Sequence, residues 1–341
     1  MKILICGDIH WSQYSSILRK RGEKYSTRLE NLIQSVNWVE STAWKTNCER
    51  IVYLGDFFDK PELNAEEISA LKECSWSSLD HDFLVGNHEI TRSDLSFNST
   101  NVFQFLKHYK VHNTIDAIEC GDCVLIMLPY TFDENRSPLS DVCAEYGYGY
   151  TKTVICSHND LKIAYGQYSS TIGYDVSEIE ANCDLFINGH IHNGCTVSNK
   201  VINIGNLTGQ NFGEDAFAYR HCVMILDTDT LHYDFYENPY ALNFYKINDE
   251  ATLYSKINDL TNAIISVKIS EKNFGKVDNL IKESKNILAS RICIEREPTP
   301  TDTSKYLELH CDDHLTQFKN YILQNMGADE TVQYELSKVC E

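Results

Sequence analysis

The sequence predicts an α/β protein with a two-sheet sandwich, a small α+β capping domain and a C-terminal helical tail. Short apolar runs that end in glycine, aspartate, asparagine or histidine recur along residues 1–238. Helical stretches separate the early runs, whereas the runs after Gly189 follow one another with short turns. This order is typical of two sheets packed face to face with helices outside. Around Asn238-Pro239 the pattern changes to strand, helix and strand.

The predicted strands share an apolar or β-branched run bounded by a turn residue. They are Lys2–Cys6, Ile51–Leu54, Asp82–Val85, Val124–Leu128, Thr153–Cys156, Asp184–Ile187, Val201–Ile204, Cys222–Leu226 and Leu231–Tyr236. Helices are predicted at Tyr25–Trp44, Ala65–Cys74 and Thr100–His108. Cys120-Gly-Asp-Cys123 stands without a second cysteine pair, so it indicates a turn between two strands rather than a zinc site.

The C-terminal third divides into three predicted parts. Strand Ile264–Ile269, amphipathic helix Lys276–Leu288 and strand Arg291–Glu295 form a capping domain over residues 239–297. Residues 298–304 form a stiff, polar linker. Residues 305–341 form two helices with an apolar stripe at Leu315, Phe318, Ile322 and Leu323. That stripe packs either on the protein's own core or on a partner.

Bulk composition is that of an ordinary globular protein. The chain has 341 residues, of which 43% are apolar and 23% charged, enough for more than one domain. We expect no membrane span, because no window approaches 18 uncharged apolar residues. The apolar start Met1–Cys6 reaches Gly7-Asp8 too soon for a signal peptide. Thirteen scattered cysteines indicate reduced thiols and a cytoplasmic location.

The net charge of −19 argues against broad, non-specific binding of nucleic acid. It leaves specific binding possible, because carboxylates that hold metal ions count as negative while the loaded site attracts phosphate. Arg19, Arg21 and Lys24 are candidates for contacts with backbone phosphates. A solvated start of the following helix explains them equally well.

Metal-type ligands follow five of the predicted strands. They are Asp8 and His10, Asp56 with Asp59, Asn87 and His88, His158, and finally His190 and His192. A lone histidine at a strand end is more often structural than a ligand. Five histidines in this one context, each near a turn residue, are hard to explain that way. Residues two apart in an extended segment point the same way, so each pair can reach one ion.

These ligands fit two metal ions. Asp8, His10, Asp56 and His192 form one predicted set, and Asp56, Asn87, His158 and His190 form the other, with Asp56 bridging. Imidazole mixed with carboxylate and amide oxygen suits manganese, iron or zinc better than calcium. Two ions roughly 3.5–4 Å apart can generate a bridging hydroxide and clamp a phosphoryl oxygen. The sequence therefore predicts hydrolysis of a phosphoester.

His88 is left over from both ligand sets. We expect it to face the scissile phosphate, stabilise its developing charge and protonate the leaving oxygen. Asp59 is expected to orient His88 through a hydrogen bond, with a solvated turn residue as the alternative.

The five segments together resemble the calcineurin-like metallophosphoesterase superfamily. Its motifs appear as Gly7-Asp8-Ile9-His10, Gly55-Asp56-Phe57-Phe58-Asp59, Gly86-Asn87-His88-Glu89, His158 and Gly189-His190-Ile191-His192. The segment 201–215, the two strands after it, the small domain and the tail are similar to the SbcD-type DNA nucleases. Many of those relatives have Asp at the position of Glu89 and His at the position of Asp59.

This narrower resemblance implies a manganese-dependent exonuclease and endonuclease, acting in DNA repair, recombination or phage DNA processing. It implies a homodimer in the cytoplasm of a bacterium or a phage-infected cell. Its partner would be an SbcC-type coiled-coil ABC ATPase, bound through the helices of residues 305–341. The domain at 239–297 would guide DNA to the metal ions held in the nuclease domain, residues 1–238.

Two alternatives stay open at this stage. A stand-alone phosphatase or cyclic-nucleotide phosphodiesterase would use the same ligands but would not need residues 240–341. A non-catalytic scaffold would keep the fold alone, although the presence of every expected ligand speaks against it. Turnover of DNA rather than of small phosphoesters separates the nuclease from the stand-alone enzyme, and substitution of His88 separates both enzymes from the scaffold.

Overall fold

The computed structural model describes residues 1–295, except positions 16, 17, 19, 93, 105, 166, 167 and 215. The predicted linker (298–304) and tail (305–341) lie outside the described residues. The predicted domain boundaries at 238 and 297 stay predictions. The described residues contain two six-stranded sheets, one three-stranded sheet and one two-stranded hairpin.

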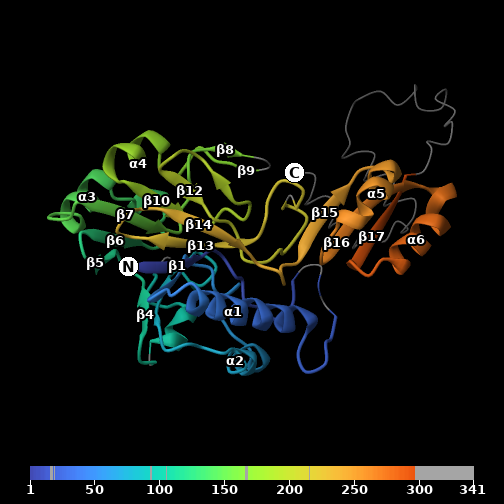
Figure 1. The fold of residues 1–341 in the computed structure, drawn as a ribbon, viewed down its shortest axis with the longest axis horizontal. Helices are drawn as coiled ribbons and strands as arrows, with labels where there is room; N and C mark the ends of the chain where they lie inside the picture. Colours follow the sequence, from blue (N-terminus) through green and yellow to red (C-terminus); the bar gives the residue numbers. More distant parts are fainter. Residues whose placement is uncertain are drawn as a thin grey trace, which may run out of the picture. The chain divides into compact units, whose positions relative to one another are not determined.

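The first sheet has the strand order β14-β13-β1-β2-β3-β4, and Figure 1 labels its strands β1, β4, β13 and β14. Its strands are Lys2–Cys6 (β1), Arg50–Tyr53 (β2), Asp80–Leu84 (β3), Tyr109–His112 (β4), Cys222–Asp227 (β13) and Tyr233–Glu237 (β14). Strands β1 to β4 are parallel, whereas β13 pairs antiparallel with both β1 and β14. The carboxyl ends of β1, β2 and β3 therefore lie at one edge of the sheet.

The second sheet has the order β11-β12-β10-β7-β6-β5. Its strands are Asp116–Cys120 (β5), Cys123–Leu128 (β6), Lys152–Ser157 (β7), Leu185–Asn188 (β10), Cys195–Thr196 (β11) and Val201–Asn203 (β12). Strands β6, β7, β10 and β12 are parallel, and β5 and β11 are antiparallel edge strands. The predicted turn at Cys120–Cys123 is confirmed, since it joins β5 to β6. The hairpin consists of Ala164–Tyr165 (β8) and Tyr168–Ser169 (β9).

Side-chain alternation along the strands explains the layers. One set of alternate residues forms the core between the two sheets, and it includes Ile3, Ile5, Val52, Leu54, Leu125, Met127, Val154 and Ile187. On the opposite face of the first sheet, Leu4, Cys6, Ile51, Tyr53 and Phe83 pack against helix Thr27–Lys45 (α1) and its surroundings. The apolar stripe of α1 is buried as predicted, at Leu29, Leu32, Val36, Val39 and Ala43.

Further short helices complete the sandwich. Helix Ala65–Leu71 (α2) lies beside α1 and starts with a capping box between Asn64 and Glu67. Helices Leu139–Tyr146 (α3) and Val176–Asn182 (α4) cover the outer face of the second sheet through the cluster of Leu139, Val142, Ile155, Ile179 and Phe186. Single-turn 3-10 helices lie at Ser99–Phe103 and Asp133–Asn135. The predicted two-sheet α/β sandwich is confirmed.

The third sheet, with the order β15-β16-β17, belongs to an α+β unit after residue 239. Its strands are Asn243–Ile247 (β15), Ala263–Ser270 (β16) and Ile287–Glu295 (β17). Helices Glu250–Lys256 (α5) and Phe274–Glu283 (α6), with 3-10 turns at Ile257–Asp259 and Glu271–Asn273, accompany it. Their shared core includes Tyr245, Leu253, Ile265, Val267, Val277 and Ile281.

Two helix predictions need correction. The predicted helix Thr100–His108 is wrong, because only a 3-10 turn forms at Ser99–Phe103 before strand β4 begins at Tyr109. The predicted helix Lys276–Leu288 ends at Glu283, and Ile287 already belongs to β17. Among the described residues, no helix is long and apolar enough to cross a membrane.

Candidate metal centre

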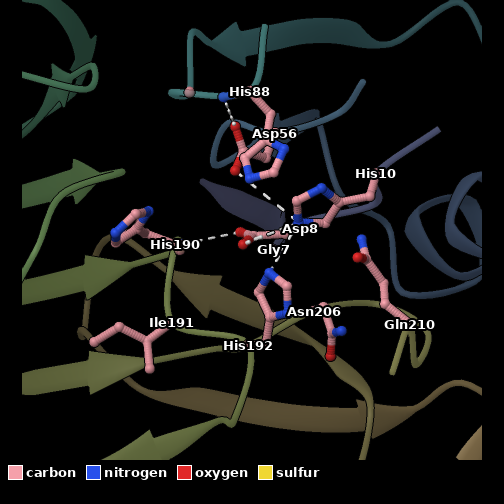
Figure 2. A network of polar contacts seen from close by, with 12 residues as sticks. Gly7, Asp8, His10, Asp56, His88, His190, Ile191, His192, Asn206 and Gln210 are labelled. Atoms are coloured by element: carbon pink, nitrogen blue, oxygen red, sulfur yellow. Dashed lines mark hydrogen bonds and ion pairs between the residues drawn. The ribbon is translucent and has the colours of Figure 1, made fainter. Parts of the chain in front are cut away.

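The predicted ligands meet where the two sheets present the carboxyl ends of their parallel strands. Asp8 and His10 follow β1, Asp56 follows β2, and Asn87 and His88 follow β3. From the second sheet, His158 follows β7, and His190 and His192 follow β10. Figure 2 shows Asp8 and Asp56 between the side chains of His10, His88, His190 and His192. We call the seven predicted ligands the candidate metal centre: Asp8, His10, Asp56, Asn87, His158, His190 and His192.

Backbone geometry at this edge is unusual. His10, Asp56 and His190 have positive φ angles of 52°, 45° and 70°, a region that residues other than glycine seldom occupy. The amide of His10 donates to the Asp56 carbonyl at 2.8 Å, which ties the first two loops together. Strained backbone that the surrounding structure maintains is typical of functional sites.

The glycine before Asp56 leaves room for another ligand. Gly55 has a φ of 92°, and a Cβ atom there would come within 2.5 Å of the His158 ring. A Cβ atom at Gly86 would likewise lie 2.2 Å from Asp56 Oδ1. The recurrent glycine therefore serves close approach of the ligands as well as the turn.

Among the described residues, three groups of side chains are close enough to hold a metal ion, and one of them, His10, Asp56 and His88, shares a residue with each of the other two. Of those two, the first group is Asp8, His10 and His192, and the second group is Asp56, His158 and His190. In the first group, the Nε2 atoms of His10 and His192 are 3.0 Å apart. In the second group, His158 Nε2 lies 3.2 Å from Asp56 Oδ2.

Asp56 and Asn87 each lie close to residues of more than one strand end. Asp56 Oδ2 lies 4.0 Å from His10 Nε2, so this carboxylate faces both groups. Asn87 Oδ1 lies 3.2 Å from His158 Nε2 and 3.0 Å from His190 Nδ1. The structure thus brings all seven predicted ligands together, whereas their division between two metal ions stays a prediction.

Each of the four histidines has an oxygen acceptor at the ring nitrogen turned away from the centre. The pairs are His10 Nδ1 with Asp59 Oδ1 at 3.0 Å, His158 Nδ1 with the Leu54 carbonyl at 2.6 Å, His190 Nε2 with Asp160 Oδ1 at 3.3 Å, and His192 Nδ1 with Glu214 Oε1 at 3.5 Å. Such partners fix the tautomer and leave the other nitrogen free for a metal ion.

The residues fit a pair of divalent cations. Asp8 Oδ2 is buried and has no hydrogen-bond partner in the described part of the chain, and a buried carboxylate oxygen without a partner is costly. Asp8 Oδ1 accepts from the backbone amide of His190 at 2.9 Å, as Figure 2 shows. Imidazole nitrogens with carboxylate and amide oxygens make a ligand set for transition metals.

Electrostatics at the centre couple Asp56 with His158. Burial alone would raise the pKa of Asp56, but the imidazoles of His158, His10 and His88 hold it well below its usual range. Burial works against protonation of His158, and yet the carboxylates of Asp56 and Asp8 raise its pKa to about 9. In the metal-free protein, a proton on His158 therefore balances part of the carboxylate charge.

His88 is more exposed than the predicted ligands, with 43% of its side chain accessible. Its Nδ1 lies 3.1 Å from the backbone carbonyl of Asp59. The Asp59 carboxylate instead contacts His10 Nδ1 at 3.0 Å, and lies 3.8 Å from His88 Nδ1. Asp59 thus meets both rings: through its backbone it orients His88, and through its carboxylate it orients His10.

The sequence analysis assigns no role to two buried residues around the centre, Glu89 and Arg28. Glu89 accepts hydrogen bonds from the amides of Phe58 and Gly86, and burial, followed by the charge of Asp56, raises its pKa to about 8. Arg28 is buried on α1 and donates to the His10 and Gly209 carbonyls. Arg28 could have been found from the sequence, because it is a charged residue on the buried face of an amphipathic helix.

The predicted phosphate contacts are engaged elsewhere. Arg21 forms an ion pair with Glu66 at 2.6 Å, and Lys24 forms one with Glu73 at 2.6 Å. Arg19 lies outside the described residues. Exposed pairs of this kind are weak, so the two cations remain available to a stronger anionic ligand.

Comparison with protein families gives one match. Residues 1–194 match the family model of the calcineurin-like phosphoesterases, which covers all seven residues of the candidate metal centre together with His88. The comparison with curated proteins finds no match.

Several solved structures are similar. An archaeal phosphodiesterase has 16% sequence identity and a TM-score of 0.35, over 70% of this chain and 99% of that one. The protein TT1561 of Thermus thermophilus has 11% identity and a TM-score of 0.42, over 69% of this chain and 98% of that one. A dimetal phosphatase from Danio rerio has 14% identity and a TM-score of 0.40, over 65% of this chain and 91% of that one.

Proposed function

The chain belongs to the calcineurin-like phosphoesterase family, and from this premise we propose that it is a two-metal DNA nuclease of the SbcD type. The family binds two divalent metal ions. The observation that carries phosphoester hydrolysis is the placement of two ligand groups, Asp8/His10/His192 and Asp56/His158/His190, at one edge of the sandwich. We propose manganese for both positions, because the mixed nitrogen and oxygen ligands suit it.

Bound divalent ions supply the Lewis acidity that activates water and neutralises phosphoryl charge. The chain's own residues provide the positioning and the proton. Asp56 faces both ligand groups, and its Oδ1 is held by the backbone amide of His88 at 2.9 Å. His88 donates a hydrogen bond from Nδ1 to the Asp59 carbonyl, which leaves Nε2 available to the substrate. From there, protonated His88 gives its Nε2 proton to the leaving oxygen.

The loop after His192 supports a polymeric substrate over a small one. This loop joins the centre to the α+β unit, since the Gly209 amide donates to the Leu242 carbonyl at 2.9 Å. The rings of Phe212 and Phe244 also pack edge to face, 5.2 Å apart. A stand-alone phosphatase has no need of this fastened unit, whereas a nuclease uses such a unit to guide a strand towards the ions.

We further propose a homodimer that works with an SbcC-type coiled-coil ATPase. Residues 305–341 are the proposed binding segment for that ATPase, on the basis of their sequence alone. A basic surface supplied by the partner would offset the net charge of −19.

The same charge favours a second candidate, a phosphatase or cyclic-nucleotide phosphodiesterase that acts on small esters. Arg21 and Lys24, the two predicted phosphate contacts that the structure describes, are both paired with glutamates. A small phosphoester would need only the ions and His88, and no extended basic surface.

End-labelled linear double-stranded DNA, a chromogenic phosphodiester and a phosphomonoester, each with manganese, distinguish the candidates. An Asp56→Asn variant is the blank, since it removes the residue that faces both groups. We expect cleavage of DNA that the variant lacks. Turnover of the small esters with intact DNA, even with a coiled-coil ATPase added, would exclude the nuclease and leave the second candidate.

A further inference from the structure

We propose that Asp160 and Glu214 are positioning residues that hold the two histidines of the Gly189-His-Ile-His192 motif in opposite tautomers. By fixing one histidine, each carboxylate determines how tightly one of the two metal positions binds its ion. The inference rests on the proposed two-metal centre but not on the identity of the substrate. Glu214 lies beyond residues 1–194, which the family model covers, and Asp160 is not one of the seven predicted ligands.

The two rings meet their carboxylates through different nitrogens. His190 turns Nε2 towards Asp160 Oδ1 at 3.3 Å, so that Nδ1 faces Asn87 and the second group. His192 turns Nδ1 towards Glu214 Oε1 at 3.5 Å, so that Nε2 faces His10 and the first group. A carboxylate accepts a hydrogen bond and cannot donate one, so it places the ring proton on the nitrogen that it faces. The Asn87 amide oxygen at His190 Nδ1 is also an acceptor, but the charged carboxylate of Asp160 is the stronger of the two. His190 is therefore the Nε2–H tautomer and His192 the Nδ1–H tautomer.

Asp160 is itself held in place. The Tyr168 hydroxyl, on β9, donates to Asp160 Oδ1 at 3.0 Å. The backbone carbonyl of Asp160 also accepts from the Tyr174 amide at 3.0 Å. This short loop between His158 and β8 thus presents its carboxylate to His190 in one orientation, and the carboxylate adds a fixed negative charge behind that ring.

Glu214 is held more tightly. Only 4% of the residue is exposed, and its carboxylate accepts from Asn206 Nδ2 at 2.9 Å and from the Gln210 amide at 3.0 Å. Figure 2 shows Asn206 and Gln210 beside His192 and His10. Arg28, buried on α1, donates to the Gly209 carbonyl in the same loop. Its guanidinium also attracts the Glu214 carboxylate electrostatically. Burial of a carboxylate next to a histidine is costly unless both are satisfied, as they are here.

Imidazole ¹⁵N chemical shifts of the metal-free full-length chain test the tautomers directly, at a pH high enough to leave the His192 ring neutral, because burial of that ring is outweighed by Glu214, which raises its pKa. We expect the two opposite tautomers in the wild type. In Asp160→Ala only His190 should lose its preference, and in Glu214→Ala only His192 should do so. Asp160→Asn and Glu214→Gln, which keep an oxygen acceptor without the charge, should restore the tautomer in part. The same tautomer for both rings, or shifts that ignore the substitutions, would overturn the proposal whether or not the protein is active.

Manganese binding, followed by calorimetry and electron paramagnetic resonance, tests the consequence. We expect two ions in the wild type. Asp160→Ala should weaken one of them about 10–100-fold and Glu214→Ala the other. Asp133→Asn is the matched control, because Asp133 lies in a neighbouring loop and bonds the Gly173 amide and Arg136 rather than a histidine. Equal weakening of both ions by either variant would indicate a general structural role and contradict the proposal. Site-selective weakening in a protein that hydrolyses no phosphoester would uphold it while the proposed function fails.

Discussion

His88 differs from the other histidines of the site in its surroundings, and this difference predicts its role. The rings of His10 and His158 are fully buried, whereas 43% of the His88 side chain is accessible. We expect His88→Asn to lower kcat by about 10²- to 10⁴-fold, because it removes the general acid, while manganese binding stays intact. His108→Asn is the control, since that side chain is 42% accessible and faces Asp80 rather than the centre. Steady-state turnover and calorimetry on the same samples measure both effects, and a parallel loss of metal would reassign His88 as a ligand.

Glu89 predicts a measurable effect of pH on stability. Its carboxyl is protonated in the folded metal-free protein up to its pKa of about 8, whereas in the unfolded chain it ionises near its ordinary value. The unfolded state therefore binds fewer protons between roughly pH 4.5 and 8, and stability falls as pH rises through this window. Glu89→Gln cannot ionise, so this slope should be absent from the variant.

The same variant loses one of the two acceptors for the Phe58 and Gly86 amides. At pH 5 we expect Glu89→Gln to be less stable than the wild type by about 1–3 kcal/mol, with the difference shrinking towards pH 8. Urea unfolding with a chelator at several pH values measures it. Parallel pH profiles for the two proteins would show that Glu89 is already ionised in the fold.

The sequence predicts ligands better than it predicts their supports. Asp8, Asp56 and His190 could be found because each comes just after a buried strand, and strand ends of a parallel sheet converge. Asp160 is two residues from His158, yet only the folded hairpin shows that it faces His190. Glu214 has no local pattern that separates it from a solvated acidic loop. Hydrogen bonds between distant loops depend on tertiary geometry, which spacing does not encode.

At the scale of elements, strands were predicted more reliably than short helices. The eleven predicted strands all form, because apolar runs bounded by turn residues are a direct sign of burial. Thr100–His108 has apolar residues at helical intervals, but the segment ends after a 3-10 turn and His108 takes a φ of 69°. The short strands β4, β8, β9, β11 and β15 and the short helices α3, α4 and α5 were missed, since such brief runs give weak signals.

The turn between β2 and the centre allows a matched test of crowding. Gly55 and Gly149 have φ angles of 92° and 91°, but only Gly55 has the His158 ring against it. Gly149→Ala should cost about 1–2 kcal/mol of unfolding free energy, from the left-handed backbone alone. Gly55→Ala should cost about 1–3 kcal/mol more, because the added methyl pushes on a packed ring.

Gly55→Ala should also weaken manganese at the second group, whereas Gly149→Ala should leave metal binding unchanged. Chemical unfolding and calorimetry measure the two effects. Equal costs and intact metal binding in both variants would mean that the His158 ring has room to move, and that Gly55 serves the turn alone.

For the whole molecule, the buried charges of the centre connect metal binding with stability. Asp8, Asp56 and Glu89 are buried, and Asp8 Oδ2 has no hydrogen-bond partner among the described residues. Divalent ions that bind the folded chain and not the unfolded one stabilise it by mass action. The net charge of −19 acts in the same direction, since each bound cation reduces the magnitude of this charge and the repulsion within the folded chain.

We therefore expect manganese to raise the unfolding free energy by about 2.7 kcal/mol for each site filled at a hundredfold excess over its Kd. A chelator should reverse the gain, with a lower Tm and no loss of the folded state. Asp56→Asn should lose most of the gain, because Asp56 faces both groups. Its metal-free form should also be less stable than the metal-free wild type, since the buried His158 ring loses its carboxylate partner. Thermal unfolding of both proteins over a manganese titration measures the gain in stability and the stability of each metal-free form. A variant that still gains the full increment would show that the ions bind elsewhere and that the candidate metal centre is not their site.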